Sequence, residues 1–233
     1  MRELVRLIIA RIGGIFLYLF SALVYRTCRV FVTGEEKVYE ALEYDGPIIL
    51  TSWHGMTMMV AAFARRYLDT STFAGIAPDD KDGRTLEVFG QKLGIEVFSM
   101  DVYGDNTLGT GRRLIGLIRS MRSGKNLIIH PDGPAGPAYK IKPGIIYLAK
   151  TTKALILPLG CYCRNAYHIP RWDRYTLPLP FSKIHIQVGD PIRIPDGDQP
   201  LEEISYAVED IFNRISFQAA KNYYGISRKL NRS

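Results

Sequence analysis

Cysteine is scarce in this 233-residue chain, which contains only Cys28, Cys161 and Cys163. An odd number of cysteines gives no disulfide framework, and this argues against an oxidised, secreted domain. The Cys161-x-Cys163 pair has no matching histidine or second cysteine pair, so it is a poor zinc site and is better explained by packing. We therefore expect no metal centre, and we expect the chemistry of the protein to face the cytosol.

Two further signatures are missing, and each absence excludes a class of protein. No Gly-x-Ser-x-Gly segment occurs, which argues against an ordinary lipase. The basic residues are scattered along the chain and form no recognition-helix or RNA-binding signature, so we expect no nucleic-acid partner. The formal net charge of +7 still favours anionic partners, such as an anionic lipid surface or an acidic carrier protein.

The apolar run near the N-terminus is short for a membrane span. Fourteen uncharged residues lie between Arg11 and Arg26, which as a helix reach about 21 Å against a bilayer core of about 30 Å. Snorkelling arginines would lengthen the run, so a full span stays possible, as does a buried helix. A signal peptide is less favoured because no small-residue cleavage pattern follows. We predict that residues 1–30 form a membrane-associated helix that lies in or partly enters the cytoplasmic leaflet of the inner membrane.

Residues 31–233 have the composition and the pattern of an α/β domain. The chain is 47% hydrophobic and 23% charged, enough apolar material for a sizeable core. Its segments alternate between strand-like and helix-like hydrophobic patterns, which predicts a mixed sheet covered by helices. The predicted strands lie at 28–32, 47–52, 73–77, 95–98, 126–130, 155–162 and 184–188, and the predicted helices at 56–67, 85–93, 108–122, 145–151 and 201–223.

Polar residues that follow predicted strands are the first candidates for a site. His54 follows an apolar strand and precedes a helix, at the strand edge where open α/β sheets bind ligands. Asp82, in the segment 79–83, also lies between a strand and a helix, where a carboxylate would orient the His54 ring and stabilise its charged form. An Asp-Gly turn that caps the helix explains Asp82 equally well.

Two loops are the next candidates, because each could bind an anion or place a carboxylate. The glycine-rich stretch 104–111 opens a helix and is followed by Arg112 and Arg113, which together suit an anion. The loop 130–137 contains Asp132 and Gly133 between a buried strand and two Gly-Pro pairs, and a stiff loop of this kind is typical of a site. Lys140 follows this loop and could pair with a phosphate.

Taken in order, these motifs resemble the lysophospholipid acyltransferase superfamily, and more narrowly a bacterial branch long catalogued as a domain of unknown function. The shared motifs are a Trp-His-Gly after the first strand, an Asp-Gly before the next helix, an Asp-Gly-Pro-x-Gly-Pro loop and a Trp-Asp-Arg segment that ends in Leu-Pro-x-Pro-Phe. They stand here at 53–55, 82–83, 132–137 and 172–181, and the closing Gly-Asp-Pro-Ile at 189–192 also matches. The similarity covers residues 32–194.

The resemblance implies roles for particular residues. The superfamily's catalytic histidine, which deprotonates the acceptor, corresponds to His54. The usual acid five positions later is replaced by Met59, so the orienting role is assigned to Asp82. The acceptor-binding Glu-Gly loop corresponds to Asp132 and Gly133. No arginine occurs around 98–101, where the superfamily's phosphate-binding arginine usually lies. This leaves two alternatives, that Arg112 or Arg113 substitutes for it or that the acceptor lacks a glycerol phosphate.

The predicted function is therefore acyl transfer to a lipid at a membrane surface. A free histidine has a pKa of about 6.5, so its ring accepts a proton at neutral pH while the acceptor attacks the acyl carbonyl. The donor would be acyl-CoA or acyl carrier protein as a co-substrate, with no bound cofactor, and the acceptor a lysophospholipid or a related lipid hydroxyl or amine. Two alternatives stay open, an inactive lipid-binding or scaffold protein of the same fold and an acyl-ester hydrolase.

Overall fold

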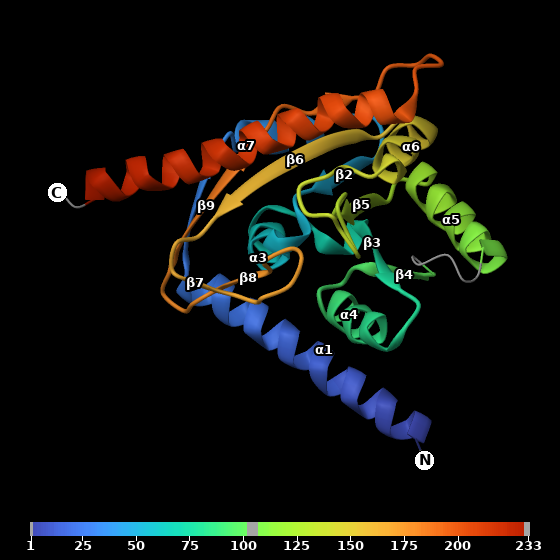
Figure 1. The fold of residues 1–233 in the computed structure, drawn as a ribbon, viewed down its shortest axis with the longest axis horizontal. Helices are drawn as coiled ribbons and strands as arrows, with labels where there is room; N and C mark the ends of the chain where they lie inside the picture. The colour runs from blue at the N-terminus through green and yellow to red at the C-terminus, as the bar shows by residue number, and fades with distance from the viewer. Residues whose placement is uncertain (1, 102–106, 231–233) are drawn as a thin grey trace.

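The computed structural model describes the backbone of residues 2–101 and 107–230 and the side chains of residues 3–80, 83–101 and 109–225. Most of the chain surrounds one eight-stranded mixed sheet with the strand order β1-β9-β6-β2-β5-β3-β4, and β10 also pairs with β6 (Figure 1). The strands of this sheet are β1 (Arg29–Thr33), β2 (Ile48–Thr51), β3 (Phe73–Pro78), β4 (Glu96–Met100), β5 (Asn126–Ile129), β6 (Leu155–Tyr162), β9 (Lys183–Val188) and β10 (Ile192–Arg193).

Five strands form a parallel core, and the remaining strands make the sheet mixed. Strands β6, β2, β5, β3 and β4 pair in parallel, whereas β9 and β10 pair with β6 in antiparallel fashion. Ile48, Ile49 and Leu50 of β2 are fully buried because helices cover both faces of the sheet. A separate two-stranded hairpin pairs β7 (Ala166–His168) with β8 (Thr176–Pro178).

Helices pack on both faces, around two hydrophobic clusters. One cluster joins the sheet to α5 (Thr107–Arg122), α6 (Pro143–Thr152) and α7 (Leu201–Leu230). The other joins it to α1 (Arg2–Thr27), α2 (Glu36–Leu42) and α3 (Thr57–Tyr67). Helix α4 (Lys81–Lys92) packs between α1 and strands β3 and β4. The fold is thus the predicted α/β arrangement with a mixed sheet and an apolar N-terminal helix.

Helix α7 crosses the sheet at very close range, and a glycine makes this possible. A Cβ atom at Gly160 in β6 would overlap the backbone of Ile215 in α7. Phe212 of α7 is fully buried on the same helix and contacts the ring of Trp53. The C-terminal helix therefore fixes the position of the segment that precedes His54.

The N-terminal helix is longer than its uncharged core suggests. Helix α1 has 26 residues, about 39 Å at 1.5 Å per residue, because it continues through Arg6 and Arg11. Within the described part of the chain it is the one helix long and apolar enough to cross a membrane, judged by length and composition alone. Its length is therefore no obstacle to a full span.

Candidate functional site

His54 lies at the carboxyl end of β2, in the middle of the sheet. It opens a short 3₁₀ helix, η1 (His54–Met56), which leads directly into α3. The neighbouring strand β5 ends at Ile129 and is followed by the loop that contains His130 and Asp132. The carboxyl ends of these two parallel strands bring the Trp-His-Gly segment and the Asp-Gly-Pro loop together, as their shared edge of the sheet requires.

Asp132 ties these two segments to each other. Its carboxylate accepts a hydrogen bond from the backbone N–H of His54 at 2.8 Å and another from that of Tyr139 at 3.3 Å. The side chain is almost fully buried, and burial raises the pKa of the carboxyl although both N–H groups act to lower it. Asp132 therefore positions the main chain of His54. Its predicted role in binding the acceptor stays a prediction.

Gly133 is needed because the His54 ring lies directly against it. A Cβ atom at this position would be 2.8 Å from Cδ2 of His54, closer than real Cβ atoms approach other heavy atoms. Any side chain here would push the ring from its place. The Asp-Gly pair thus places both the backbone and the ring of His54.

The acid that contacts the His54 ring is Asp173. Nδ1 of His54 lies 2.7 Å from Oδ2 of Asp173, whose side chain is fully buried. An ionised carboxylate can only accept hydrogen bonds, so Nδ1 carries the proton in this pair. In the neutral ring, Nε2 then has a free lone pair that can take a proton from another group. His54 and Asp173 form a histidine–aspartate dyad.

Arg171 holds the Asp173 carboxylate in place. Its Nε donates to Oδ1 and its Nη2 donates to Oδ2, both at 3.0 Å, in a bidentate ion pair. Such pairs fix the plane of the carboxylate. The guanidinium also lies 5.4 Å from the ring centre of Tyr175. Arg171 thus contacts both oxygens of Asp173, including Oδ2, which also contacts His54.

Gly55 allows the chain carrying Asp173 to come this close. A Cβ atom at Gly55 would overlap the backbone oxygen of Asp173. The glycine of the Trp-His-Gly motif therefore has a packing reason, since it admits the loop that delivers the acid.

A second histidine, His130, lies beside His54, and burial keeps it neutral. The ring of His130 lies 5.5 Å from that of His54, centre to centre, and its Nδ1 donates to the backbone oxygen of Ser52 at 2.9 Å. Burial lowers the pKa of His130 to about 3, with a further contribution from His54. Its Nε2 lies 3.1 Å from the hydroxyl of Thr57, which also donates to the backbone oxygen of His54 at 2.6 Å, so the oxygen and nitrogen acceptors share one hydroxyl proton. His130 supports the site without competing for the proton.

Aromatic rings enclose the remaining sides of His54. The ring centres of Trp172 and Tyr175 lie 5.4 and 6.0 Å from the His54 ring, and the His54 side chain is 20% exposed. Burial raises the pKa of Tyr175 to about 12, so its hydroxyl stays protonated at neutral pH. The site is therefore sheltered yet open to solvent on one side.

The acid that contacts the His54 ring in the structure differs from the one that the sequence predicted. The place on Nδ1 predicted for Asp82 is occupied by Asp173, and the Asp82 side chain lies outside the described residues. Met59, at the position of the superfamily's usual acid, is fully buried in the cluster between the sheet and α1–α3. A carboxylate at residue 59 would face the core instead of the His54 ring.

The predicted anion-binding cations mostly have partners of their own. Arg113 pairs with Asp79 at 3.1 Å and also donates to the backbone oxygen of Ser99. Lys140 pairs with Glu209 of α7 at 2.6 Å. Arg112 is exposed on α5, and residues 104–106 of the predicted glycine-rich loop lie outside the described residues. Their roles toward a substrate stay predictions, and an anion would have to compete for Arg113 and Lys140.

Asp173 and Arg171 were not predicted as site residues. The available signal was the Trp-Asp-Arg segment at 172–174, which the resemblance identified as a shared motif without giving it a role. A buried aspartate is rarely found without a partner, so a shared aspartate among aromatic residues is itself a candidate acid.

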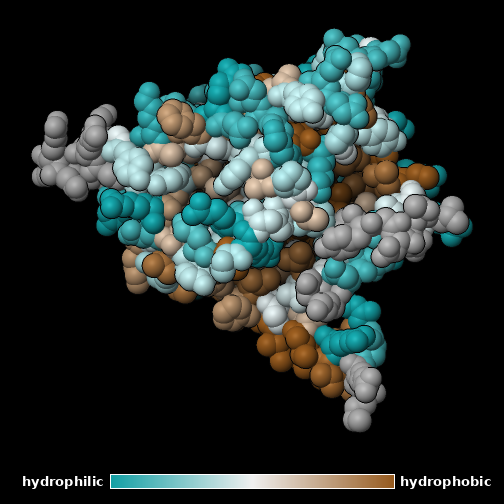
Figure 2. All heavy atoms as spheres, viewed as in Figure 1, coloured by the Kyte–Doolittle hydropathy of each residue, from teal (hydrophilic) through white to brown (hydrophobic). Residues whose placement is uncertain are grey.

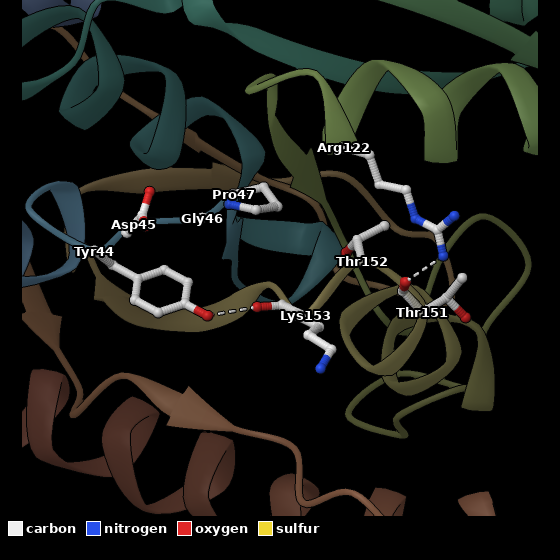
Figure 3. Close-up of a pocket in the computed structure, with 8 residues that line it drawn as sticks. All are labelled: Tyr44, Asp45, Gly46, Pro47, Arg122, Thr151, Thr152 and Lys153. Carbon is white, nitrogen blue, oxygen red and sulfur yellow. Dashed lines mark hydrogen bonds between the residues drawn. The ribbon is translucent and has the colours of Figure 1, made fainter.

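A pocket at the opposite end of β2 is separate from the His54 site. It has a volume of about 420 Å³ and lies where the chain enters β2 and leaves α6 (Figure 3). Its polar side chains already serve the main chain, since the hydroxyl of Tyr44 donates to the backbone oxygen of Lys153 and Arg122 donates to that of Thr151, both at 2.9 Å. Because His54 lies at the other end of β2, this pocket takes no part in the His54 site.

Comparison with known proteins identifies the fold. No protein-family model matches the chain. The uncharacterised protein RP090 of Rickettsia prowazekii (strain Madrid E) is 28% identical over 181 residues, which cover 77% of this chain and 80% of that protein. The crystal structure of PlsC from Thermotoga maritima, a 1-acyl-sn-glycerophosphate acyltransferase, matches with a TM-score of 0.56 and 19% identity over 94% of this chain and 83% of that chain. The chain has the PlsC fold.

The PlsC fold agrees with the resemblance found in the ordered motifs of the sequence. At 19% identity the likeness establishes how the sheet and helices are arranged. The chemistry of the site is therefore argued from its own residues, above all from the His54–Asp173 pair.

Proposed function

We propose that this protein is an acyltransferase that moves a fatty acyl group from acyl-CoA or an acylated carrier protein to a lysophospholipid or a related lipid hydroxyl or amine. The observation that carries the proposal is the 2.7 Å contact between Nδ1 of His54 and Asp173, on an acyltransferase-like fold. This contact leaves Nε2 of His54 as the group that can accept a proton. PlsC, which has this fold, is an acyltransferase that acts on a 1-acyl-glycerophosphate.

The proposed reaction is a direct transfer with His54 as the general base. Nε2 takes the proton from the acceptor hydroxyl or amine as the acceptor oxygen or nitrogen attacks the thioester carbonyl carbon. The carbon–sulfur bond then breaks, and the imidazolium returns the proton to the leaving thiolate, so that the products are an ester or amide and a free thiol. Asp173 keeps the ring in the required tautomer and stabilises the transient positive charge.

The dyad argues for turnover over an inactive scaffold. The departure at Met59 favours a scaffold only if nothing else orients His54, and Asp173 takes that place with its own ion pair to Arg171. An unused histidine–aspartate–arginine arrangement, with a fully buried carboxylate, would cost desolvation energy without benefit.

We also propose that α1 attaches the protein to the inner membrane and lies along its cytoplasmic surface. Six apolar residues on one face of α1 are 44–65% exposed and follow helical spacing, namely Val5, Ile9, Ile12, Phe16, Leu19 and Leu23. Figure 2 shows hydrophobic residues along the lower edge of the molecule, where α1 lies in Figure 1. An exposed apolar face of this length is typical of a helix that contacts lipid.

The opposite face of α1 supports a position along the membrane surface, because it is occupied by the rest of the protein. Glu3 forms an ion pair with Arg84 of α4, which lowers the pKa of the Glu3 carboxyl. Near the middle, Gly14 lies against Val88, and the guanidinium of Arg65 stacks on Tyr18 at 4.6 Å. If α1 crossed the bilayer, it would have to leave these contacts or draw charged residues of α4 into the hydrocarbon.

The test is product analysis with a matched pair of histidine variants. Wild type, His54→Ala and His168→Ala would each receive labelled acyl-CoA or acylated carrier protein and a panel of lysolipids and aminolipids, with products followed by mass spectrometry. His168 is an exposed histidine on β7 and serves as the control. We expect acylated lipid from wild type and His168→Ala, and a loss of about 10²–10⁴-fold in His54→Ala.

Two other results would contradict the proposal. Free fatty acid formed without any acceptor would identify a hydrolase. No turnover with any donor, together with tight lipid binding, would identify a scaffold.

A further inference from the structure

The turn between β8 and β9 exposes apolar side chains to an unusual degree. Phe181 is 80% exposed and Leu179 is 50% exposed. Phe181 also has a positive φ of 64°, a left-handed conformation that is unfavourable for a bulky side chain. Backbone strain that holds an aromatic ring in solvent points to a function for the ring outside the folded chain.

Hydrogen bonds hold this turn in place, so the exposure of Phe181 does not come from a loose loop. The N–H of Ser182 donates to the backbone oxygen of Leu179 at 3.2 Å and closes the turn. The hydroxyl of Ser182 donates to the backbone oxygen of Asn165 at 2.7 Å, and the N–H of Leu179 donates to the same oxygen at 3.0 Å. Ser182 itself is buried. The fold therefore presents the two apolar side chains on a fixed support.

The turn lies directly beside the end of α1. The thiol of Cys28, one residue after the helix, donates to the backbone oxygen of Leu179 at 3.4 Å. The N–H of Arg29 donates to the backbone oxygen of Ser182 at 2.9 Å. The exposed residues of the turn thus stand next to the C-terminal end of the apolar face of α1, which finishes at Leu23.

The surroundings of the turn carry positive charge. Arg26 and Arg29 are exposed, Lys183 is partly exposed, and none of the three forms an ion pair with a described acidic residue. Apolar side chains with unpaired cations beside them match the boundary of an anionic bilayer, where the hydrocarbon takes the apolar groups and the headgroups take the charges.

We propose that the β8–β9 turn is a second membrane contact, which inserts Phe181 and Leu179 into the same leaflet that receives the exposed face of α1. This inference rests on the proposed membrane location of the protein. With α1 alone the protein could turn about the helix axis. A second contact at the β8–β9 turn would fix the orientation of the protein on the membrane. The segment that supplies the turn also supplies Asp173, since only β8 and its short flanks separate the two. The His54 site is therefore held close to the surface where its lipid acceptor would be.

The test compares exposed phenylalanines on opposite sides of the molecule. Phe181→Ser and Phe217→Ser would be assayed by co-sedimentation with vesicles of phosphatidylglycerol and phosphatidylethanolamine, and with vesicles of phosphatidylcholine. Phe217 is 72% exposed on α7, which runs along the edge opposite α1 in Figure 1. We expect Phe181→Ser to weaken binding by about tenfold or more, as the loss of one buried aromatic side chain implies, and Phe217→Ser to leave it unchanged.

A second variant removes the ring without straining the turn. Glycine adopts positive φ at no steric cost, so Phe181→Gly keeps the backbone and should weaken binding as much as Phe181→Ser does. Equal binding by wild type, Phe181→Ser and Phe181→Gly would overturn the proposal, as would equal losses in Phe181→Ser and Phe217→Ser.

A depth measurement gives an independent reading. Phe181→Cys and Phe217→Cys would each be labelled with a thiol-reactive fluorophore, which the three native cysteines resist because they are buried. Lipids with a quencher in the acyl chain should quench the label at residue 181 and not the label at residue 217. No quenching at residue 181 would overturn the proposal. Because none of these readouts uses enzyme activity, the membrane contact can be confirmed even if acyl transfer is not found, and the reverse also holds.

Discussion

Replacing Asp173 by asparagine should remove most of the activity while keeping the shape of the site. The amide has almost the same volume as the carboxylate, so the His54 ring stays surrounded. Its NH₂ group can donate to Nδ1 where the carboxylate accepted from it, which leaves the proton on Nε2. In that tautomer the ring can no longer accept a proton from the lipid acceptor. General base catalysis typically contributes about 10²–10⁴-fold, and we expect kcat to fall by that amount.

The same change has a second effect, on stability, that can be measured apart from the rate. Asp173 is fully buried and accepts two hydrogen bonds from Arg171 as well as one from His54. The amide keeps part of this network but leaves the Arg171 guanidinium, whose side chain is 42% exposed, without its charge partner. We expect the free energy of unfolding to fall by about 1–3 kcal/mol. Urea unfolding of wild type and Asp173→Asn at pH 7 checks this value.

Kinetics at saturating donor and acceptor separate a positioning role from simple loss of structure. The KM for the acyl donor should change little, because Asp173 acts through His54. Asp190→Asn is the matched control, since Asp190 is an exposed aspartate paired with Lys37 on the surface. In a double-mutant cycle, Asp173→Asn should lower the rate almost no further once His54→Ala is present, because the carboxylate affects catalysis only through that ring. A kcat of Asp173→Asn within threefold of wild type, or full additivity in the cycle, would refute the reasoning.

Two further predictions concern the support under His54. Gly133→Ala should lower kcat by at least tenfold and destabilise the fold by about 1–3 kcal/mol, because the new methyl group would lie 2.8 Å from the His54 ring. Gly144→Ala is its control, since a Cβ atom there meets no atom within 4 Å. His130→Gln should flatten the pH dependence of stability below pH 6.5. With a pKa of about 3 in the folded protein and about 6.5 in the unfolded chain, His130 binds protons preferentially in the unfolded state between these values. His130 alone should therefore lower the unfolding free energy of wild type by about 2 kcal/mol between pH 7 and pH 5, a loss that His130→Gln should lack when both are measured by urea unfolding.

Each of these predictions has a result that would contradict it. Equal activity of Gly133→Ala and Gly144→Ala would mean that the His54 ring does not need its observed place. The same loss of stability in wild type and His130→Gln between pH 7 and pH 5 would mean that His130 is protonated in the folded protein.

Much of the fold could be predicted because its strands are short apolar runs that end in polar loops. The predicted strand at 155–162 coincides with β6, and that at 73–77 differs from β3 by one residue. Helix α2, the hairpin β7–β8 and the two-residue β10 were not predicted. Each is too short to show a hydrophobic period, and β7 and β8 pair only with each other. Their existence depends on tertiary contacts that no local window contains.

The site could be predicted only where the sheet itself brings residues together. His54 and Asp132 follow adjacent parallel strands, so their meeting follows from the strand order. Asp173 comes from a loop inside the β7–β8 hairpin, and its approach depends on the absence of a side chain at Gly55. The partners of Lys140 and Arg113 likewise come from elsewhere, Glu209 on α7 and Asp79 after β3, so sequence alone could not show that these cations are paired.

The separation of 119 residues between His54 and Asp173 also determines when the contact between them can form. During synthesis, β2, η1 and the Asp132 loop leave the ribosome well before the segment that carries Asp173. Contacts between residues so far apart in the sequence form slowly. The nascent chain therefore has a histidine but no dyad until β6 and the β7–β8 hairpin have docked. Under the proposed function, a chain that has been made only as far as β5 would therefore leave fatty acyl thioesters intact.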